Sequence, residues 1–141
     1  MVNYLMERKV NDKKYDCLFL RLLVYKMASH EKNLNLYEQA IALQPEITRK
    51  GKANPYTSHN GHMFSFLDKE GKLGIRLSIE DKTTFEEMHK SPPFIQHNAV
   101  MNGYVTIPQK LLENTSELSI YLKKGLDFVS SLKPKPSKKK K

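Results

Sequence analysis

Cysteine and tryptophan are almost absent: the 141 residues include one cysteine, Cys17, and no tryptophan. A lone thiol excludes a disulfide within the chain and points to a reducing compartment. No cysteine–histidine signature surrounds Cys17, which argues against a thiol nucleophile. We therefore interpret Cys17 as a buried or incidental thiol.

Long apolar runs are also missing. The longest extends from Cys17 to Tyr25 and is interrupted by Arg21, whereas a membrane-spanning helix needs about 20 apolar residues. The same run lacks the clean apolar stretch and the small-residue cleavage site of a secretory signal. We therefore expect a cytoplasmic protein that makes no membrane contact.

The sequence shows no familiar catalytic or metal-binding motif. It has no nucleophile elbow, no phosphate-binding glycine loop and no dinucleotide fingerprint. His59 and His62 are spaced three apart but lie beside a turn, without a nearby cysteine or acid to complete a metal site. The adjacent Glu80 and Asp81 fit a helix start better than an acid/base pair. We expect no enzyme activity, no cofactor and no metal, with a catalytic site assembled from distant residues as the alternative.

The formal net charge of +9 is unevenly distributed. Residues 1–26 are net basic, residues 27–132 contain as many acids as bases, and residues 133–141 are basic without any acid. Such a lysine run is usually solvated, but it can also attract phosphates in a salt-dependent way. A solubilising tail and a weak contact with nucleic acid are thus both open. The lysines of this run are Lys133, Lys135, Lys138, Lys139, Lys140 and Lys141.

Composition divides the chain into an N-terminal extension over 1–32, one domain over 33–132, and a disordered lysine- and proline-rich tail over 133–141. Met27 is followed by Ala-Ser and then by a helical pattern, as at a natural start. We hypothesise that the native protein begins at Met27 and that the preceding residues are over-extended translation.

The alternative for the N-terminal residues is an added helix over about 13–29. It would bury Leu18, Leu22 and Tyr25, which are spaced i, i+4 and i+7.

Hydrophobic periodicity predicts an α+β domain, a mixture of amphipathic helices and alternating strands. Strict alternation predicts a hairpin of strands 62–67 and 72–79, with Met63, Ser65 and Leu67 on one face of the first strand. In the second strand, the residues expected to face the core are Leu73, Ile75, Leu77 and Ile79.

The remaining predicted elements follow from caps, prolines and apolar stripes. Asn33 or Asn35 caps the first helix, Asp81 caps the second, and Phe85 and Met88 of the second point inward. The expected ranges are helices over 33–44, 81–89 and 116–131, a turn or short helix over 109–113, and extended segments over 46–58, 94–98 and 104–107.

Three segments together resemble the N-terminal domain of the TfoX/Sxy family. They are the hairpin GHMFSFLDKEGKLGIRLS, the strand and turn AVMNGYVTIPQKLLE, and the end of the last predicted helix with the residues after it, LKKGLDFVSSLKPKP. The resemblance covers about 34–135, and Met63-Phe64 corresponds to the Met-Phe motif of the family. Ser65-Phe66 stands where the family has Gly-Gly, and the insert NPYTSHN is atypical, which indicates a divergent single-domain member.

The resemblance implies an α+β fold in which flanking helices pack on an antiparallel sheet of about four or five strands. It also implies a link to the regulation of DNA uptake, without an enzyme assignment. We accordingly expect a non-enzymatic binding or regulatory domain, linked to competence or transcription. The alternatives are a weak nucleic-acid binder that uses the basic tail and an enzyme of unrecognised type. The sequence identifies neither a protein partner nor an oligomeric state.

The candidate binding surface is one extended segment that combines three cations, an aromatic ring and small hydrogen-bond donors. This mixture suits phosphate or single-strand contact, where cations hold the backbone and a ring stacks. The alternative is a solvated edge strand whose lysines discourage aggregation, with Tyr56 packed on the core. The residues of the segment are Arg49, Lys50, Lys52, Tyr56, Thr57, Ser58 and Asn60.

Overall fold

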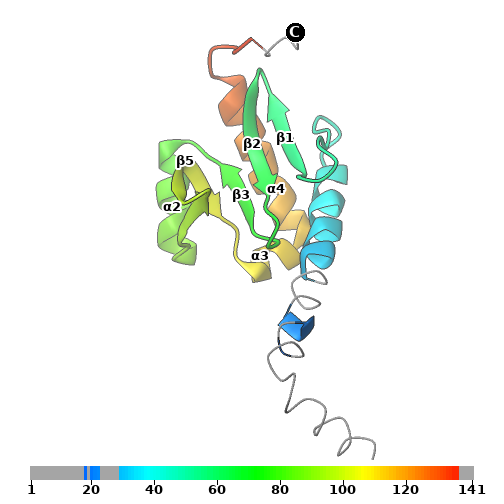
Figure 1. Cartoon of the computed structure of the whole chain (residues 1–141). Coiled ribbons are helices and arrows are strands. Elements are labelled where there is room, and N and C mark those ends of the chain that lie inside the picture. The colour runs from blue at the N-terminus through cyan, green and yellow to red at the C-terminus, as the bar shows by residue number, and fades with distance from the viewer. Residues whose placement is uncertain (1–17, 19, 23–28, 137–141) are drawn as a thin grey trace, which may run out of the picture.

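The computed structural model describes residues 18, 20–22 and 29–136 of the chain. They form a five-stranded antiparallel sheet with helices packed on it, so the predicted α+β class is confirmed (Figure 1). The strand order is β1-β2-β3-β5-β4. After a helix over 29–42, the elements are β1 (Tyr56–His59), β2 (His62–Leu67), β3 (Leu73–Arg76), α2 (Ile79–His89), β4 (Pro93–Gln96), β5 (Ala99–Thr106), α3 (Gln109–Glu113) and α4 (Thr115–Ser130).

The predicted hairpin of two alternating strands is confirmed. β2 and β3 pair antiparallel, with Ser65 opposite Ile75 and Leu67 opposite Leu73. A two-residue turn of Asn60 and Gly61 joins β1 to β2, and both residues have positive φ, at 56° and 78°. This turn matches the right-handed twist of the flanking strands, which is why Asn-Gly is favoured there.

The predicted alternation in β2 fails at Phe64. Thr57 of β1 lies opposite Ser65, but Ser58 lies opposite Met63, so Phe64 is an extra residue in a β-bulge. Phe64 and Ser65 are consecutive yet both fully buried, whereas Met63 is only half-buried. The prediction that Met63 shares the inner face with Ser65 is therefore wrong, because the bulge reverses the alternation N-terminal to it.

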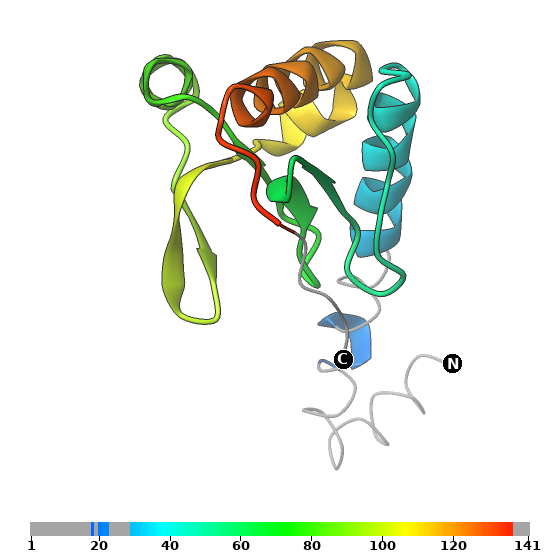
Figure 2. The same ribbon diagram turned by 90° about the horizontal axis from the view of Figure 1, so that it is seen from above.

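The main core lies between the sheet and α4 (Figure 2). A Cβ on Gly125 of α4 would lie 3.1 Å from the ring of Phe64 and 3.2 Å from Ile75. The glycine thus lets the helix backbone approach the sheet closely. The buried stripe of α4 supplies Leu118, Leu122, Leu126 and Val129, and burying each such side chain contributes about 1.5–3 kcal/mol.

Several predicted side-chain positions are wrong near the helix ends. Ile79 and Met88 are 83 % and 65 % exposed rather than inward. Ile79 starts α2, where Ser78 rather than Asp81 is the cap and its hydroxyl accepts from Asp81 N. Leu18 lies in helical backbone but is exposed, so the burial expected for an added N-terminal helix is wrong there.

Leu22 is likewise helical and exposed, whereas Tyr25 and Met27 lie outside the described residues. Asn33 does not cap the first helix, which already includes residue 29. Its side chain is instead buried and donates to the carbonyl of Gly71 at 2.8 Å. This long-range bond ties the first helix to the β2–β3 turn.

Three buried hydroxyls join the first helix to the edge strand β1 and to its neighbour β2. The Oγ of Ser65 in β2 lies 2.5 Å from the Oη of Tyr37 and also hydrogen-bonds the Oγ1 of Thr57 in β1. All three residues are fully buried. The Ser65 hydroxyl is therefore the shared partner of two polar groups that have no access to water.

Replacing Ser65 by alanine leaves the hydroxyls of Tyr37 and Thr57 without this partner. We expect the Ser65→Ala change to lower the free energy of unfolding by about 1–3 kcal/mol, the cost of an unsatisfied buried polar group. Urea unfolding of Ser65→Ala and of the control Ser58→Ala measures this. A stability of Ser65→Ala equal to that of the control would contradict the role of the triad.

Two buried tyrosines make the fold sensitive to alkali. Burial raises the pKa of Tyr104 from 10.0 to about 12, and burial raises the pKa of Tyr37 as well. The unfolded chain releases these protons first, so stability is lost as the pH rises above about 10. For Tyr104 alone, the loss between pH 10 and 12 is about 3 kcal/mol.

We therefore expect the melting temperature to fall steeply above pH 10 and the fall to be shallower in Tyr104→Phe. Circular dichroism melts across this pH range measure the effect, with Tyr56→Phe at a half-buried position as the control. Identical pH curves for the wild type and Tyr104→Phe would refute the assignment.

Candidate functional site

Two acid-free segments carry exposed basic side chains. Residues 47–67 contain Arg49, Lys50 and Lys52 and no acid, and residues 128–136 contain two lysines and no acid. They are separated by sixty residues of sequence, yet Asn60 and Gly61 of the first contact Lys135 of the second at the end of the sheet where β1 turns into β2. Lys50 and Lys52 precede the other end of β1, and the Lys50 ammonium group reaches along the strand to Ser58. We call the exposed residues of 49–62 together with residues 133–136 the basic end.

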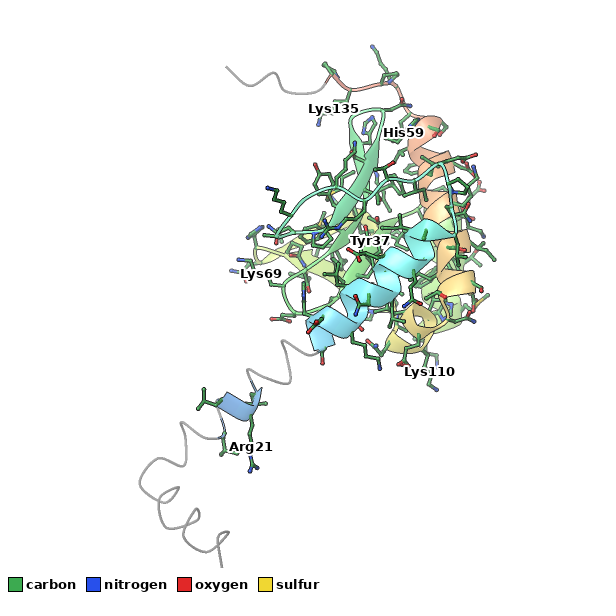
Figure 3. All side chains as sticks on the ribbon, turned by 90° about the vertical axis from the view of Figure 1, so that its right-hand side faces the viewer. Arg21, Tyr37, His59, Lys69, Lys110 and Lys135 are labelled. Atoms are coloured by element: carbon green, nitrogen blue, oxygen red, sulfur yellow. The ribbon has the colours of Figure 1, made fainter. Side chains whose placement is uncertain are left out.

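The chain that leaves α4 is fixed on the β1–β2 turn. The backbone N–H of Lys135 donates to the carbonyl of Asn60 at 2.8 Å, and the Nε2 of His62 bonds the carbonyl of Lys133 at 2.9 Å. A Cβ on Gly61 would lie only 2.0 Å from the carbonyl oxygen of Lys135. Figure 3 shows His59 and Lys135 at the same end of the molecule. Residues 133–135, expected in a disordered tail, are thus hydrogen-bonded to the domain.

A short loop presents the predicted cations. The backbone groups of Lys50 and Tyr56 exchange two hydrogen bonds, of 2.8 and 3.0 Å, and close the loop between them. The Nζ of Lys50 donates to the Oγ of Ser58 at 2.8 Å, and Lys52 is exposed. Lys50, Lys52 and Ser58 therefore lie at the surface in one neighbourhood.

Arg49 has a different role from the lysines. Its Nε lies 3.5 Å from a carboxylate oxygen of Glu38 on the first helix, and its guanidinium donates to the carbonyl of Lys52 at 3.4 Å. The side chain is half-buried. Arg49 thus holds the loop against the first helix, and its charge is largely matched by Glu38.

The strand residues of the predicted surface divide between core and solvent. Thr57 is fully buried in the hydroxyl triad, so it does not line the surface. Tyr56 is half-buried, and its ring lies 3.1 Å from the position of a Cβ on Gly51. The side-chain amide of Asn60 approaches the carbonyl of Ser130 at 3.4 Å. Asn60 is thus part of the attachment of the tail.

The acids that flank the two basic segments are neutralised. Glu46 and Asp127 both pair with Lys123, at 2.6 and 3.2 Å. Lys50, Lys52, Lys133 and Lys135 make no ion pair within the described part of the chain. The basic end therefore keeps an uncompensated positive potential, although the rest of the domain carries slightly more acids than bases.

Residues 29–136 hold no group of three histidine, cysteine or acidic side chains close enough to bind a metal ion. His59 and His62 face each other across the Asn-Gly turn, and His62 is already bonded to Lys133. Glu80 and Asp81 lie in the first turn of α2, as expected. Across the described ranges, the helices are too short or too polar to cross a bilayer.

Sequence reasoning missed a second feature, at the other end of β2. Asp68 and Gln96 line a groove there and are hydrogen-bonded to each other. The sequence shows Asp68 only as part of a polar turn. Asp at the start of such a turn signals a side-chain bond to the backbone, but nothing local indicates Gln96, which is 28 residues away.

Comparison of the chain with models of protein families, with curated proteins and with solved structures finds no match in any of the three. The resemblance to the TfoX/Sxy family therefore rests on the sequence motifs alone and stays a prediction.

Proposed function

We propose that the chain is a non-enzymatic binding domain whose basic end contacts the phosphate backbone of a nucleic acid. The observation that supports this is the hydrogen bond from Lys135 to Asn60, because it joins two basic segments that are distant in sequence. Clustered lysines displace counterions from phosphates and gain affinity from each contact. Four more lysines follow Ser137 and add to the same charge.

The chemistry of the basic end favours contact without sequence preference. Lysine ammonium groups neutralise phosphates but do not read base edges. Tyr56 and His59 lie among the cations and offer ring faces on which an unpaired base can stack. Single-stranded nucleic acid is thus the ligand that this surface fits best. A cytoplasmic location agrees with such a role.

The competing proposal is the regulatory role implied by the family resemblance, exerted through protein contact. It makes no use of the basic end. The two proposals therefore differ in how binding responds to salt and to loss of the lysines.

We expect the affinity for a single-stranded oligonucleotide to fall linearly with the logarithm of salt concentration. Neutralising Lys50 and Lys52 together by glutamine removes two phosphate contacts and lowers the slope by about 1.4. Deleting residues 133–141 lowers it further. Fluorescence anisotropy titrations at several salt concentrations measure the slopes, with Lys90→Gln/Lys110→Gln as the matched control. Binding that does not depend on salt, or an equal decrease of the slope in the control variant, would refute the proposal and favour protein contact.

A second variant tests the attachment without changing charge. In Gly61→Ala the added methyl group collides with the carbonyl of Lys135 and displaces the tail from the turn. We expect a severalfold loss of oligonucleotide affinity at low salt. Gly103→Ala is the matched control, since Gly103 has a similar positive φ of 86° but nothing within 3.6 Å of its added Cβ. Equal affinities of the two variants would show that the attachment does not matter for binding.

A further inference from the structure

A groove of about 640 Å³ lies between the β2–β3 turn and the tip of the β4–β5 hairpin. It lies at the end of β2 away from the Asn-Gly turn, six residues or about 20 Å of extended chain from the attachment of residues 133–135. Asn54, in the loop that carries Lys52, also lines it. Its lining combines apolar side chains, Phe66 and Ile95, with the polar groups of Asp68 and Gln96. The proposal for the basic end makes no use of this groove.

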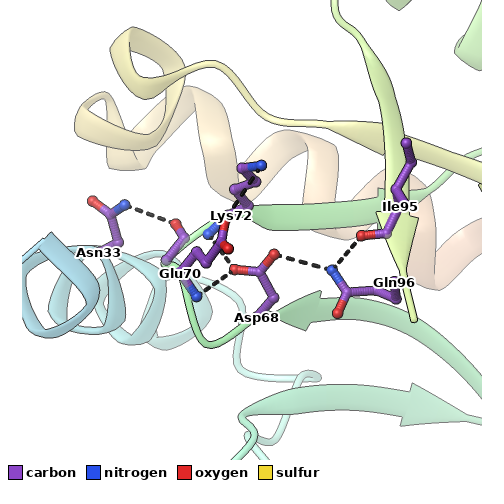
Figure 4. A network of polar contacts seen from close by, with 7 residues as sticks. Asn33, Asp68, Glu70, Lys72, Ile95 and Gln96 are labelled. Atoms are coloured by element: carbon purple, nitrogen blue, oxygen red, sulfur yellow. Dashed lines mark hydrogen bonds and ion pairs between the residues drawn. The ribbon is translucent and has the colours of Figure 1, made fainter. Parts of the chain in front are cut away.

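The carboxylate of Asp68 is the fixed charge in this groove (Figure 4). Its residue is only 7 % exposed. Oδ1 accepts from the backbone N–H groups of Glu70 and Lys72, at 2.9 and 2.8 Å, and Oδ2 accepts from the Nε2 of Gln96 at 3.0 Å. Within the described residues, no basic side chain lies within 4.0 Å of this carboxylate. It is thus a buried anion that is hydrogen-bonded but has no counter-charge.

Both walls that hold Asp68 are fixed by the fold. The β2–β3 turn is closed by the bond from Gly71 N to Asp68 O, and the Gly71 carbonyl accepts from Asn33 of the first helix. On the other wall, Gln96 precedes a turn of His97 and Asn98, both with positive φ. The carboxylate and the amide are therefore held in place before any ligand arrives.

We propose that this groove binds an organic cation, an ammonium or guanidinium group on an apolar stem. Asp68 supplies the counter-charge, because Oδ2 carries one donor and has room for another. A buried carboxylate gains more from a cation than an exposed one, since water screens the pair less. The ring of Phe66 attracts a cation through its face, and Ile95, 53 % exposed, covers the stem.

Lys69 and Lys72 also line the groove, but neither forms an ion pair with Asp68. Lys69 and Lys72 are exposed, and the Nζ of Lys72 lies 3.5 Å from a carboxylate oxygen of Glu70. Their ammonium groups end flexible stems that can turn toward solvent, whereas Asp68 is fixed by three hydrogen bonds. Of the two acids and two lysines that line the groove, Asp68 is thus the one whose charge is buried and held in place.

The test is a nuclear magnetic resonance titration of the full chain, labelled with nitrogen-15. Butylguanidinium represents a small-molecule source of the cation, and the capped tripeptide acetyl-Ala-Arg-Ala-amide represents a peptide source. We expect saturable shifts of the backbone N–H groups of Glu70, Lys72 and Gln96 with at least one of them. The same tripeptide with glutamine in place of arginine should leave these signals unchanged.

Asp68→Asn tests the charge with the shape kept. The new amide oxygen still accepts from the two backbone N–H groups, and Gln96 can turn its own amide to accept from the new NH2. We expect at least tenfold weaker binding, with Glu87→Gln, an exposed carboxylate on α2, binding as the wild type does. If Asp68→Asn does not fold, Phe66→Leu decides instead, by a severalfold loss of affinity when the ring is removed.

Binding of either cation alone identifies its source and supports the proposal. Binding of neither, equal binding of the glutamine tripeptide, or unchanged affinity in the variant that folds would overturn it. Oligonucleotide affinity should be the same in Asp68→Asn and in the wild type. A failure at the groove is thus distinguishable from a failure at the basic end.

Discussion

The hydroxyl of Ser65 is the contact on which the placement of the edge strand and the first helix depends. It is buried between Tyr37 of the helix and Thr57 of β1, and both hydroxyls need it because neither reaches water. The bulge at Phe64 makes this possible, since it turns Phe64 and Ser65 to the same face. The ring then packs under α4 while the hydroxyl meets the first helix. A strand with strict alternation would direct one of the two side chains away from the helices.

The basic end follows from the same constraint. Thr57 fixes the register of β1, and the register fixes where the Asn-Gly turn lies. Asn60 then meets the backbone of Lys135, and the absence of a side chain on Gly61 leaves room for its carbonyl. A polar contact in the core thus determines the position of the turn to which the chain after α4 is attached.

The sequence could predict whatever depends on neighbours along the chain. Alternation predicted β2 and β3. The turn at Asn60-Gly61 and the cap Asn114 of α4 likewise follow from residue types that favour these positions locally. It could not predict what depends on a distant partner. The bulge is defined only by the pairing with β1, and the role of Asn33 only by the turn at Gly71. Ile79 continues the apolar alternation of β3 in the sequence, but in the structure it is the first residue of α2.

In the candidate sites, too, the sequence predicts what depends on single residues and fails to predict what depends on distant partners. The lysines at 50 and 52 and the lysine run could be identified from composition, because charge is a property of each residue alone. The attachment of residues 133–135 to the β1–β2 turn could not be predicted, because it depends on one backbone bond between Asn60 and Lys135. The groove could not be predicted at all, because Asp68 lines it together with Gln96, which belongs to another hairpin.

The two sites also differ in how their charge can act. The lysines of the basic end are exposed and numerous, so they attract any polyanion and discriminate little among sequences. Asp68 is a single charge held by three hydrogen bonds at the end of β2 away from the Asn-Gly turn. A fixed charge in a shaped groove discriminates by geometry, because a ligand must place its cation where the carboxylate already is. If one molecule occupies both ends, affinity comes from the lysines and selectivity from Asp68.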